Sequence, residues 1–206
     1  MKVEDIKTEY SNKFIKVYDT KYDDGHHYYI ASRRDKDDLS AESLNDKPDA
    51  VSCFVIIDDG IHVPQLLLQS EYRPPLNKYV LSVPAGLIES DEDYVYTATR
   101  ELYEETGINT DFLRTQGMAY HIFPMSEVAY SSPGFTDESN AIVVMVIQED
   151  ISDMLTHKNA KSNEHFNHFE LVTQRCAKQL LKDHQNKLPL MTYAALLYFI
   201  SGIWEE

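Results

Sequence analysis

The sequence is poor in cysteine and in basic side chains, and these shortages exclude several classes of protein. Its 206 residues include only two cysteines, Cys53 and Cys176, and neither they nor the eight histidines have the spacing of a metal site. Nineteen Lys and Arg residues stand against 34 Asp and Glu residues, which gives a formal net charge of −15. Such a charge opposes binding to nucleic acid or to an anionic membrane surface. An anionic ligand would have to be received by a metal ion and by local arginines.

The sequence also lacks an apolar run long enough to cross a membrane. The longest one, residues 188–204, has 17 residues and contains Pro189 and Gly202, whereas a spanning helix needs about 20. We interpret it as a buried C-terminal helix. The opening residues, MKVEDIKTEY, contain no apolar signal region, so we expect a cytoplasmic protein. We find no internal repeat and no low-complexity segment.

Short β-prone runs near the start predict a small N-terminal part. Residues 13–18 and 28–31 flank an Asp-Asp-Gly turn and predict an antiparallel β-hairpin over residues 13–33. A polar segment, residues 33–49, follows and should be an exposed linker. We therefore expect a domain of residues 1–49 and a larger one of residues 50–206. Because a hairpin is rarely stable alone, it should pack on the larger domain or on a second copy of the chain, which favours a homodimer.

Strand and helix patterns alternate in the larger part. Apolar stretches predict strands at residues 51–57, 65–69, 118–123 and 141–147. Helices are expected at residues 91–106, 172–182 and 190–203. This order suits an α/β fold in which a mixed sheet is sandwiched by helices.

One predicted helix carries a cluster of carboxylates. Glu101, Glu104 and Glu105 lie at helical spacing, so one turn presents all three. Carboxylates this close raise each other's pKa unless a cation neutralises them. Oxygen ligands without Cys or His favour Mg²⁺ or Mn²⁺. The turn is therefore predicted to bind a divalent metal ion.

The ends of this helix have their own signals. Ser90, with Asp93 three residues later, resembles a capping box, and Gly107 is typical of the position after a last turn. These residues predict a helix from about 91 to 106. Arg100 lies one turn before Glu104, where it can orient or partly neutralise that carboxylate. We count both among the candidate catalytic residues.

The flanks of the cluster match a known signature. Residues 86–108 read GLIESDEDYVYTATRELYEETGI and fill every fixed position of the pattern Gly-x5-Glu-x7-Arg-Glu-Leu-x-Glu-Glu-x-Gly-Ile. The segment resembles the Nudix box, the signature of hydrolases that cleave a nucleoside diphosphate linked to another moiety. The resemblance implies an α/β/α sandwich. Glu92, which lies about 180° from Glu101, is expected to be a structural partner and not a metal ligand.

The resemblance also implies how metal and substrate would be held. The three glutamates and the backbone carbonyl of Ala85 would bind about two or three Mg²⁺ ions, with Mn²⁺ as a possible substitute. The metals would clamp the nonbridging phosphate oxygens and hold the attacking water. Gly86, the first residue of the box, is assigned to substrate binding.

Residues outside the box resemble the ADP-ribose pyrophosphatase subfamily. Pro124 lies 16 residues beyond Ile108, where that subfamily typically carries proline. The segment SPGFTDES, residues 132–139, resembles its Ser-Pro-Gly-x-x-x-Glu loop. The segment EYRPP, residues 71–75, resembles its Gln-x-Arg segment, with Glu71 in place of the usual Gln. We therefore predict Mg²⁺-dependent hydrolysis of ADP-ribose to AMP and ribose 5-phosphate.

Roles for residues around the cluster follow from this resemblance. Glu138 is the candidate general base, on a loop that can move over the metals, and Asp137 is its nearest rival. Arg73 would contact the diphosphate, and Pro124 would belong to the substrate site. Adenine would need an aromatic or apolar slot. The predicted hairpin offers three tyrosines for it, Tyr18, Tyr28 and Tyr29.

Two alternatives to ADP-ribose hydrolysis stay open. Another Nudix enzyme, acting on GDP-mannose or UDP-glucose, would present the same diphosphate to the same metals. A non-catalytic Nudix module could instead sense ADP-ribose and regulate a DNA-bound partner. Such a regulator needs a DNA-reading domain, and the roughly 55 residues after Asp150 show no basic excess. The complete set of glutamates also favours an enzyme.

Overall fold

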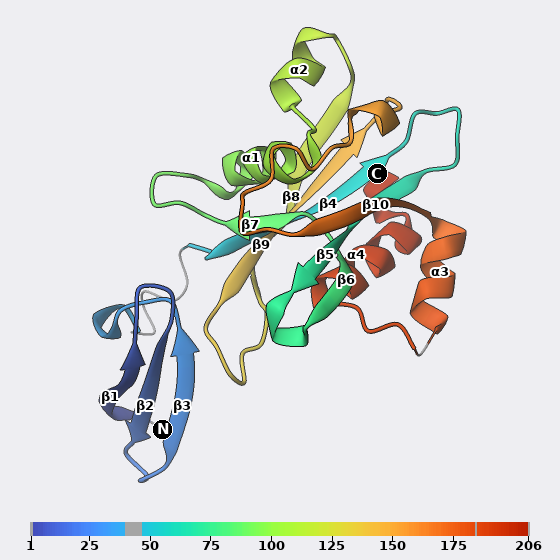
Figure 1. Ribbon diagram of the computed structural model, residues 1–206. Helices are drawn as coiled ribbons and strands as arrows, with labels where there is room; N and C mark the ends of the chain where they lie inside the picture. The colour runs from blue at the N-terminus through green and yellow to red at the C-terminus, as the bar shows by residue number, and fades with distance from the viewer. Residues whose placement is uncertain (1, 40–46, 184, 206) are drawn as a thin grey trace. The chain divides into compact units, whose positions relative to one another are not determined.

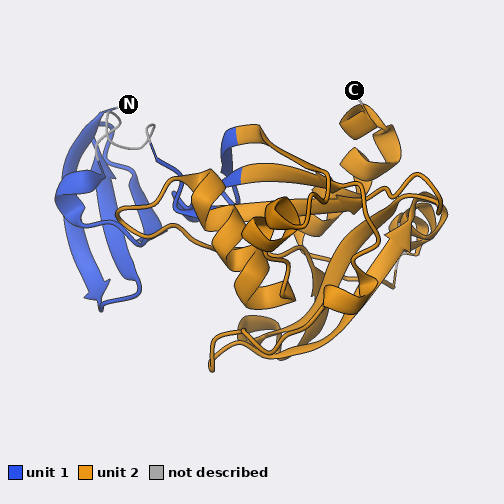
Figure 2. Ribbon diagram, turned by 90° about the horizontal axis from the view of Figure 1, so that it is seen from above, with its two compact units in different colours: residues 1–50, 127–141 blue, residues 51–126, 142–206 orange. Residues whose placement is uncertain are grey.

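The structure is a computed structural model that describes residues 2–39, 47–183 and 185–205. The chain divides into two compact units, which Figure 2 colours separately. Unit 1 comprises residues 1–50 and 127–141, and unit 2 comprises residues 51–126 and 142–206. Residues 40–46 of the predicted linker lie outside the described residues.

Unit 1 contains a three-stranded antiparallel sheet, β1 (Val3–Ser11), β2 (Lys16–Tyr22) and β3 (His27–Ser32), paired in that order (Figure 1). The predicted hairpin corresponds to β2 and β3. The turn between them contains Gly25 with φ of 85°, a backbone conformation that favours glycine. Strand β1 was not predicted, because its sequence VEDIKTEYS is mostly charged or polar and none of its residues is buried. The short 3₁₀ helix η1 (Lys36–Asp38) follows the sheet.

The loop of residues 131–138 is joined to β3 by backbone contacts. Ala31 N donates a hydrogen bond to Phe135 O at 3.0 Å, and Ala31 also forms a parallel bridge with Thr136. The loop predicted to carry the general base therefore belongs to the same compact unit as the N-terminal sheet.

Most of a seven-stranded mixed sheet belongs to unit 2, and its strand order is β10-β5-β4-β9-β8, with β6 also paired with β5 and β7 with β4. The bounds are β4 (Ala50–Ile57), β5 (Gln65–Arg73), β6 (Lys78–Ser82), β7 (Ala85–Leu87), β8 (Tyr120–Tyr130), β9 (Ser139–Ile147) and β10 (Phe166–Thr173). Every residue of β4 and β9 is buried, as expected of central strands. All four predicted strands are present. Strand β6 corresponds to the apolar, strand-like stretch of residues 79–85 that precedes the acidic helix, whereas β7 and β10 were not predicted.

The described residues of unit 2 form four α-helices, α1 (Tyr94–Thr106), α2 (Thr110–Thr115), α3 (Gln174–Lys182) and α4 (Leu190–Ser201). Three 3₁₀ helices accompany them, η2 (Pro74–Leu76), η3 (Ser152–Met154) and η4 (Ile203–Glu205). The predicted start of α1 is three residues too early. Asp93, not Ser90, caps the helix, because the Asp93 carboxylate accepts hydrogen bonds from Val95 N and Tyr96 N. Gly107 ends the helix as predicted, with φ of 80°.

Helices cover both faces of the central sheet. Cys53 and Phe54 are neighbours on β4, so their side chains point to opposite faces. The Cys53 Sγ contacts the Ala98 carbonyl of α1 at 3.8 Å. The Phe54 ring packs against Tyr198 of α4, with centroids 6.1 Å apart. The predicted α/β/α sandwich is therefore confirmed. Among the described residues, no helix has both the length and the apolar character needed to span a membrane.

Candidate active site

The three predicted metal ligands of α1 differ in their exposure. Ala98 and Leu102 are fully buried on the side of α1 that packs on the sheet. Glu101 and Glu105 are nearly as enclosed, at 1 % and 3 % exposure, while Glu104 is half-buried. A buried carboxylate is costly unless hydrogen bonds or cations compensate it. The partners of these glutamates therefore decide what the turn can bind.

Glu105 is held by neutral donors. Its Oε2 atom accepts hydrogen bonds from Gln69 Nε2 at 2.6 Å and from Ala85 N at 3.1 Å. Burial raises the pKa of Glu105 well above its ordinary value, and the nearby Glu71 and Glu101 carboxylates raise it further. A divalent cation would favour the ionised form and reverse this effect.

Glu101 lies against Gly86 and two cationic side chains. A Cβ atom added at Gly86 would overlap the Glu101 carboxyl group, so the glycine is needed for space and not for its backbone conformation. The Glu101 Oε1 atom lies 2.7 Å from Arg100 Nη1 and 3.4 Å from Lys161 Nζ. Burial raises the pKa of this carboxyl group, and Arg100 and Lys161 act in the opposite direction.

Arg100 ties the acidic turn to Glu92. Its Nε and Nη2 atoms donate to the two oxygens of Glu92 at 2.8 and 2.9 Å, a bidentate pair. Its Nη1 atom donates to Glu101 at 2.7 Å and to Glu104 at 3.2 Å. The Arg100 hydrogen bonds are the main reason that the pKa of Glu92 is lowered to about 2. Glu92 is thus a structural partner, as expected, but it precedes the Asp93 N-cap, so the helical angle from which this role was inferred does not apply to it.

Glu71 adds another buried carboxyl group near the turn. Ser82 Oγ donates to Glu71 Oε2 at 2.9 Å, and Arg73 Nη2 lies 2.7 Å from the same oxygen. Burial is the main reason that the pKa of Glu71 is raised. Arg73, the predicted diphosphate ligand, is therefore paired with Glu71, the residue that departs from the subfamily pattern. The Arg73 side chain is nevertheless 44 % exposed.

Sequence reasoning missed three side chains that surround the cluster, Gln69, Lys161 and Glu164. Lys161 Nζ lies 2.9 Å from Glu104 Oε2, and the Glu164 carboxylate is close enough to Glu71 to raise its pKa. Lys161 and Glu164 come from a loop more than 50 residues beyond the box, and neither belongs to a motif. Gln69 belongs to a predicted strand, but its contact with Glu105 depends on how that strand packs. The sequence contained no signal that would have joined these residues.

The donor set of the acidic turn fits a divalent cation. All of its side-chain donor atoms are oxygens, and the absence of a side chain at Gly86 leaves space for the Glu101 carboxylate. Within residues 2–39, 47–183 and 185–205, however, no three Asp, Glu, His or Cys side chains are gathered as a metal site. Arg100 and Lys161 contact Glu101 and Glu104, while Glu105 faces Gln69. The side chains therefore compensate one another in this arrangement.

Pro124 is exposed on β8, which lies at the end of the strand order. Such an edge strand tolerates proline because the missing N–H is not needed for pairing. The position of Pro124 thus has a structural explanation that requires no role in substrate binding.

The two candidate bases of unit 1 differ in their surroundings. Asp137 accepts a hydrogen bond from Ser32 Oγ at 2.9 Å and lies 3.7 Å from Arg34 Nη1, with 13 % of its side chain exposed. Glu138 pairs with Arg33 Nε at 3.1 Å and is 33 % exposed. Asp137 therefore fastens its loop to the residues of β3, whereas Glu138 is the more accessible carboxylate.

The three candidate tyrosines do not share one environment. Tyr18 is 1 % exposed, and its hydroxyl donates to Arg34 O at 2.9 Å. Its prediction as part of a nucleobase slot is wrong, since alternation along β2 turns its ring into the core of unit 1. Tyr28 and Tyr29 are exposed and, as neighbours on β3, point to opposite faces of the sheet. Tyr28 OH donates to Gly134 O at 2.6 Å.

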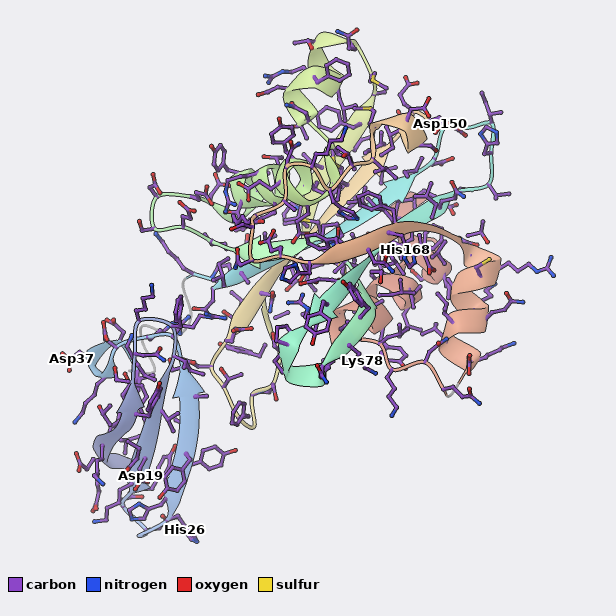
Figure 3. All side chains as sticks on the ribbon, viewed as in Figure 1. Asp19, His26, Asp37, Lys78, Asp150 and His168 are labelled. Carbon is purple, nitrogen blue, oxygen red and sulfur yellow. The ribbon has the colours of Figure 1, made fainter. Side chains whose placement is uncertain are left out.

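Unit 1 contains a pocket of about 610 Å³ with a largely aromatic lining. Tyr28 lines it, and His26 lies beside the turn that ends β2 (Figure 3). The lining residues are Tyr22, His26, His27, Tyr28, Ile30, Tyr130, Pro133, Phe135, Thr136 and Asp137. Aromatic walls with a few polar groups are typical of sites for small planar ligands.

Comparisons with known proteins agree on one family. The NUDIX domain family matches residues 46–191. The chain is similar to the ADP-ribose pyrophosphatase of Bacillus subtilis (strain 168), with 32 % identity over 138 residues, which are 67 % of this chain and 65 % of the relative. It is also similar to the ADP-sugar pyrophosphatase of Mus musculus, with 30 % identity over 102 residues, 50 % of this chain and 42 % of the relative. The matches thus span less than two thirds of these relatives.

A solved structure shares the fold. The crystal structure of an ADP compounds hydrolase superimposes on this chain with a TM-score of 0.57. The match covers 98 % of this chain and 92 % of the hydrolase chain. The sequence identity is 19 %, so this likeness concerns the fold alone.

Proposed function

The chain belongs to the Nudix hydrolase family, and on that premise we propose that it hydrolyses the diphosphate of ADP-ribose to AMP and ribose 5-phosphate. The observation that carries the proposal is the acidic turn, where Glu101, Glu104 and Glu105 share one turn of α1 beside the space left by Gly86. The names of the similar proteins, ADP-ribose and ADP-sugar pyrophosphatase, favour ADP-ribose over GDP-mannose or UDP-glucose.

The Nudix family generally uses a divalent metal, which offsets phosphate charge and lowers the pKa of a bound water. We assign the metal to Glu101, Glu104 and Glu105, together with the carbonyl of Ala85. Arg100 orients Glu101 and Glu104 through its Nη1 atom, because Glu92 fixes the rest of the guanidinium.

Substrate recognition needs cations near the diphosphate and a slot for the base. Arg73 is partly exposed and can donate to phosphate oxygens while it remains near Glu71. Taken by itself, the pocket of unit 1, where Tyr28 and Phe135 offer aromatic surface, is a candidate slot for a planar base. Tyr29 lies on the opposite face of β3 and is not assigned to this slot.

Glu138 is proposed as the general base, since its carboxylate is more accessible than that of Asp137. A second candidate arises from unit 2. Glu164 lies near Glu71, on a loop that also contacts the acidic turn through Lys161. Single substitutions, Glu138→Gln, Asp137→Asn and Glu164→Gln, separate the three by their effect on kcat.

We propose that the protein acts as a homodimer through unit 1. Its sheet and the adjoining turn expose six large apolar side chains, Val3, Tyr10, Phe14, Ile15, Tyr28 and Tyr29. Exposed apolar side chains gathered on so small a sheet are typical of an interaction surface. Light scattering should give the mass of a dimer at micromolar concentration, and a fully active monomer would reject this assembly.

A substrate panel tests the reaction itself. The purified chain is incubated with Mg²⁺ and ADP-ribose, GDP-mannose or UDP-glucose, and the phosphomonoester products are measured through a coupled phosphatase. We expect the highest kcat/KM for ADP-ribose, with AMP and ribose 5-phosphate in equal amounts. A preference for another sugar would support the alternative hydrolase, and tight ADP-ribose binding without turnover would support the sensing module.

A further inference from the structure

Lys161 contacts the same carboxylate oxygens as Arg100. Lys161 Nζ lies 2.9 Å from Glu104 Oε2 and 3.4 Å from Glu101 Oε1. Arg100 Nη1 lies 3.2 and 2.7 Å from these two oxygens. A metal ion that coordinated both carboxylates would meet two positive groups already in place, so one of them would have to move.

The loop before Lys161 is fastened to the C-terminal end of α1. Thr156 N donates to Thr106 O at 2.9 Å, and Asn159 Nδ2 donates to Tyr103 O at 3.3 Å. His157 Nδ1 makes a 2.8 Å hydrogen bond with the carbonyl oxygen of Glu105, so this nitrogen is the donor. We call residues 156–164 the strap. It satisfies the carbonyl groups of Glu105 and Thr106, which the helix end leaves without partners inside the helix.

The strap ends in a closed turn that carries Lys161. Glu164 N donates to Lys161 O at 3.0 Å, and Lys161 N donates to Glu164 Oε2 at 3.1 Å. The backbone of Lys161 is thus fixed at both sides, by the turn and by the anchored first half of the strap. Its position beside the acidic turn is a built feature of the fold and not a chance contact of a long side chain.

We propose that Lys161 is the resident counter-ion of the acidic turn, which holds Glu101 and Glu104 without metal and leaves them when Mg²⁺ binds. This inference rests on the metal site of the proposed function. Of the two cations, Arg100 is the less able to move, because it also binds both oxygens of Glu92 and the Leu87 carbonyl. The Lys161 side chain is 44 % exposed and has a flexible stem, so it can turn into solvent.

The inference predicts competition between the ammonium group and the metal ion. Lys161→Met keeps most of the length of the side chain and removes its charge. Because two partly exposed ion pairs disappear, we expect the Kd for Mn²⁺ to fall about three- to tenfold. Lys158→Met is the matched control, since Lys158 is an exposed lysine of the same strap, and its Kd should equal that of the wild type. Calorimetric titration with Mn²⁺ measures all three proteins without turnover.

Thermal unfolding supplies a second readout that is independent of catalysis. In EDTA, Lys161→Met should have a lower Tm than the wild type, because Glu101 and Glu104 have lost one of their cations. In saturating Mg²⁺ the difference should vanish. A Mn²⁺ affinity that is unchanged or weaker in Lys161→Met would overturn the inference while leaving the metal site intact. Failure of both the wild type and the variant to bind Mn²⁺ would overturn the metal site itself, and the inference with it.

Discussion

Replacement of Glu105 by glutamine should affect the stability and the activity of the protein in opposite directions. The Glu105 carboxylate is 3 % exposed, accepts two hydrogen bonds from neutral donors and has a raised pKa because of burial. A carboxyl group with a raised pKa ionises at lower pH in the unfolded chain than in the folded one. Without metal, its charge therefore opposes folding above the unfolded pKa, and this penalty is present at neutral pH.

The size of the effect follows from the environment of the side chain. Burial of an imperfectly compensated polar group costs about 1–3 kcal/mol in mutational data, so removing the charge should raise Tm in EDTA by about 2–4 °C for each kcal/mol relieved. The new amide also brings a donor near Gln69 Oε1, a buried oxygen that has no hydrogen-bond partner among the described residues. In Mg²⁺, the loss of a negative ligand should lower kcat by about 10²- to 10³-fold.

Differential scanning calorimetry with EDTA and with Mg²⁺, together with turnover of ADP-ribose, measures both effects. Glu149→Gln, which removes a carboxylate elsewhere in unit 2, is the control and should change neither. A Glu105→Gln variant that is destabilised in EDTA would contradict the energetic reasoning. One that turns over normally at saturating Mg²⁺ would remove Glu105 from the metal site.

Three further substitutions follow from the same geometry. Glu138→Gln should lower kcat by about 10²-fold with an unchanged Mg²⁺ activation curve, whereas Asp137→Asn should mainly lower Tm. Steady-state kinetics and unfolding curves measure the two effects, and a loss of kcat in Asp137→Asn but not in Glu138→Gln would mean that the base is misassigned. Gly86→Ala should push the Glu101 carboxylate out of place and cost about 10²-fold in kcat/KM, so near-normal kinetics would mean that Glu101 need not approach residue 86. The pKa of Glu92 is lowered to about 2, so its contribution to stability, about 3 kcal/mol, is complete above the unfolded pKa and is lost as pH falls toward 2. Glu92→Gln should therefore be less stable than the wild type at neutral pH and lose less stability as the pH falls. Urea unfolding at several acidic pH values measures this, and an equal dependence of the free energy of unfolding on pH in both proteins would refute it.

Much of the fold and of the acidic turn could be predicted because both depend on short-range patterns. The spacing of Glu101, Glu104 and Glu105 follows from the helix period, whereas Glu92 lies before α1, where that period does not hold. The strands β4 and β9 are apolar throughout and were visible for that reason. Strand β1 has no such pattern.

The missed features depend on packing between distant segments. Nothing in the sequence tells which alternate residues of β2 face the core, and so Tyr18 was wrongly placed in an open slot. Lys161 reaches the turn through a loop whose course is fixed by the end of α1, far away in sequence. Such contacts become visible only when the chain is folded.

The strap has a consequence for the order of assembly. Some small metal-binding domains, such as zinc fingers, do not fold until their ion is bound. Here the chain supplies its own positive groups, Arg100 and Lys161, to the acidic turn. On the proposed metal site, the chain would therefore fold before magnesium arrives, and the ion would bind and leave without an unfolded intermediate.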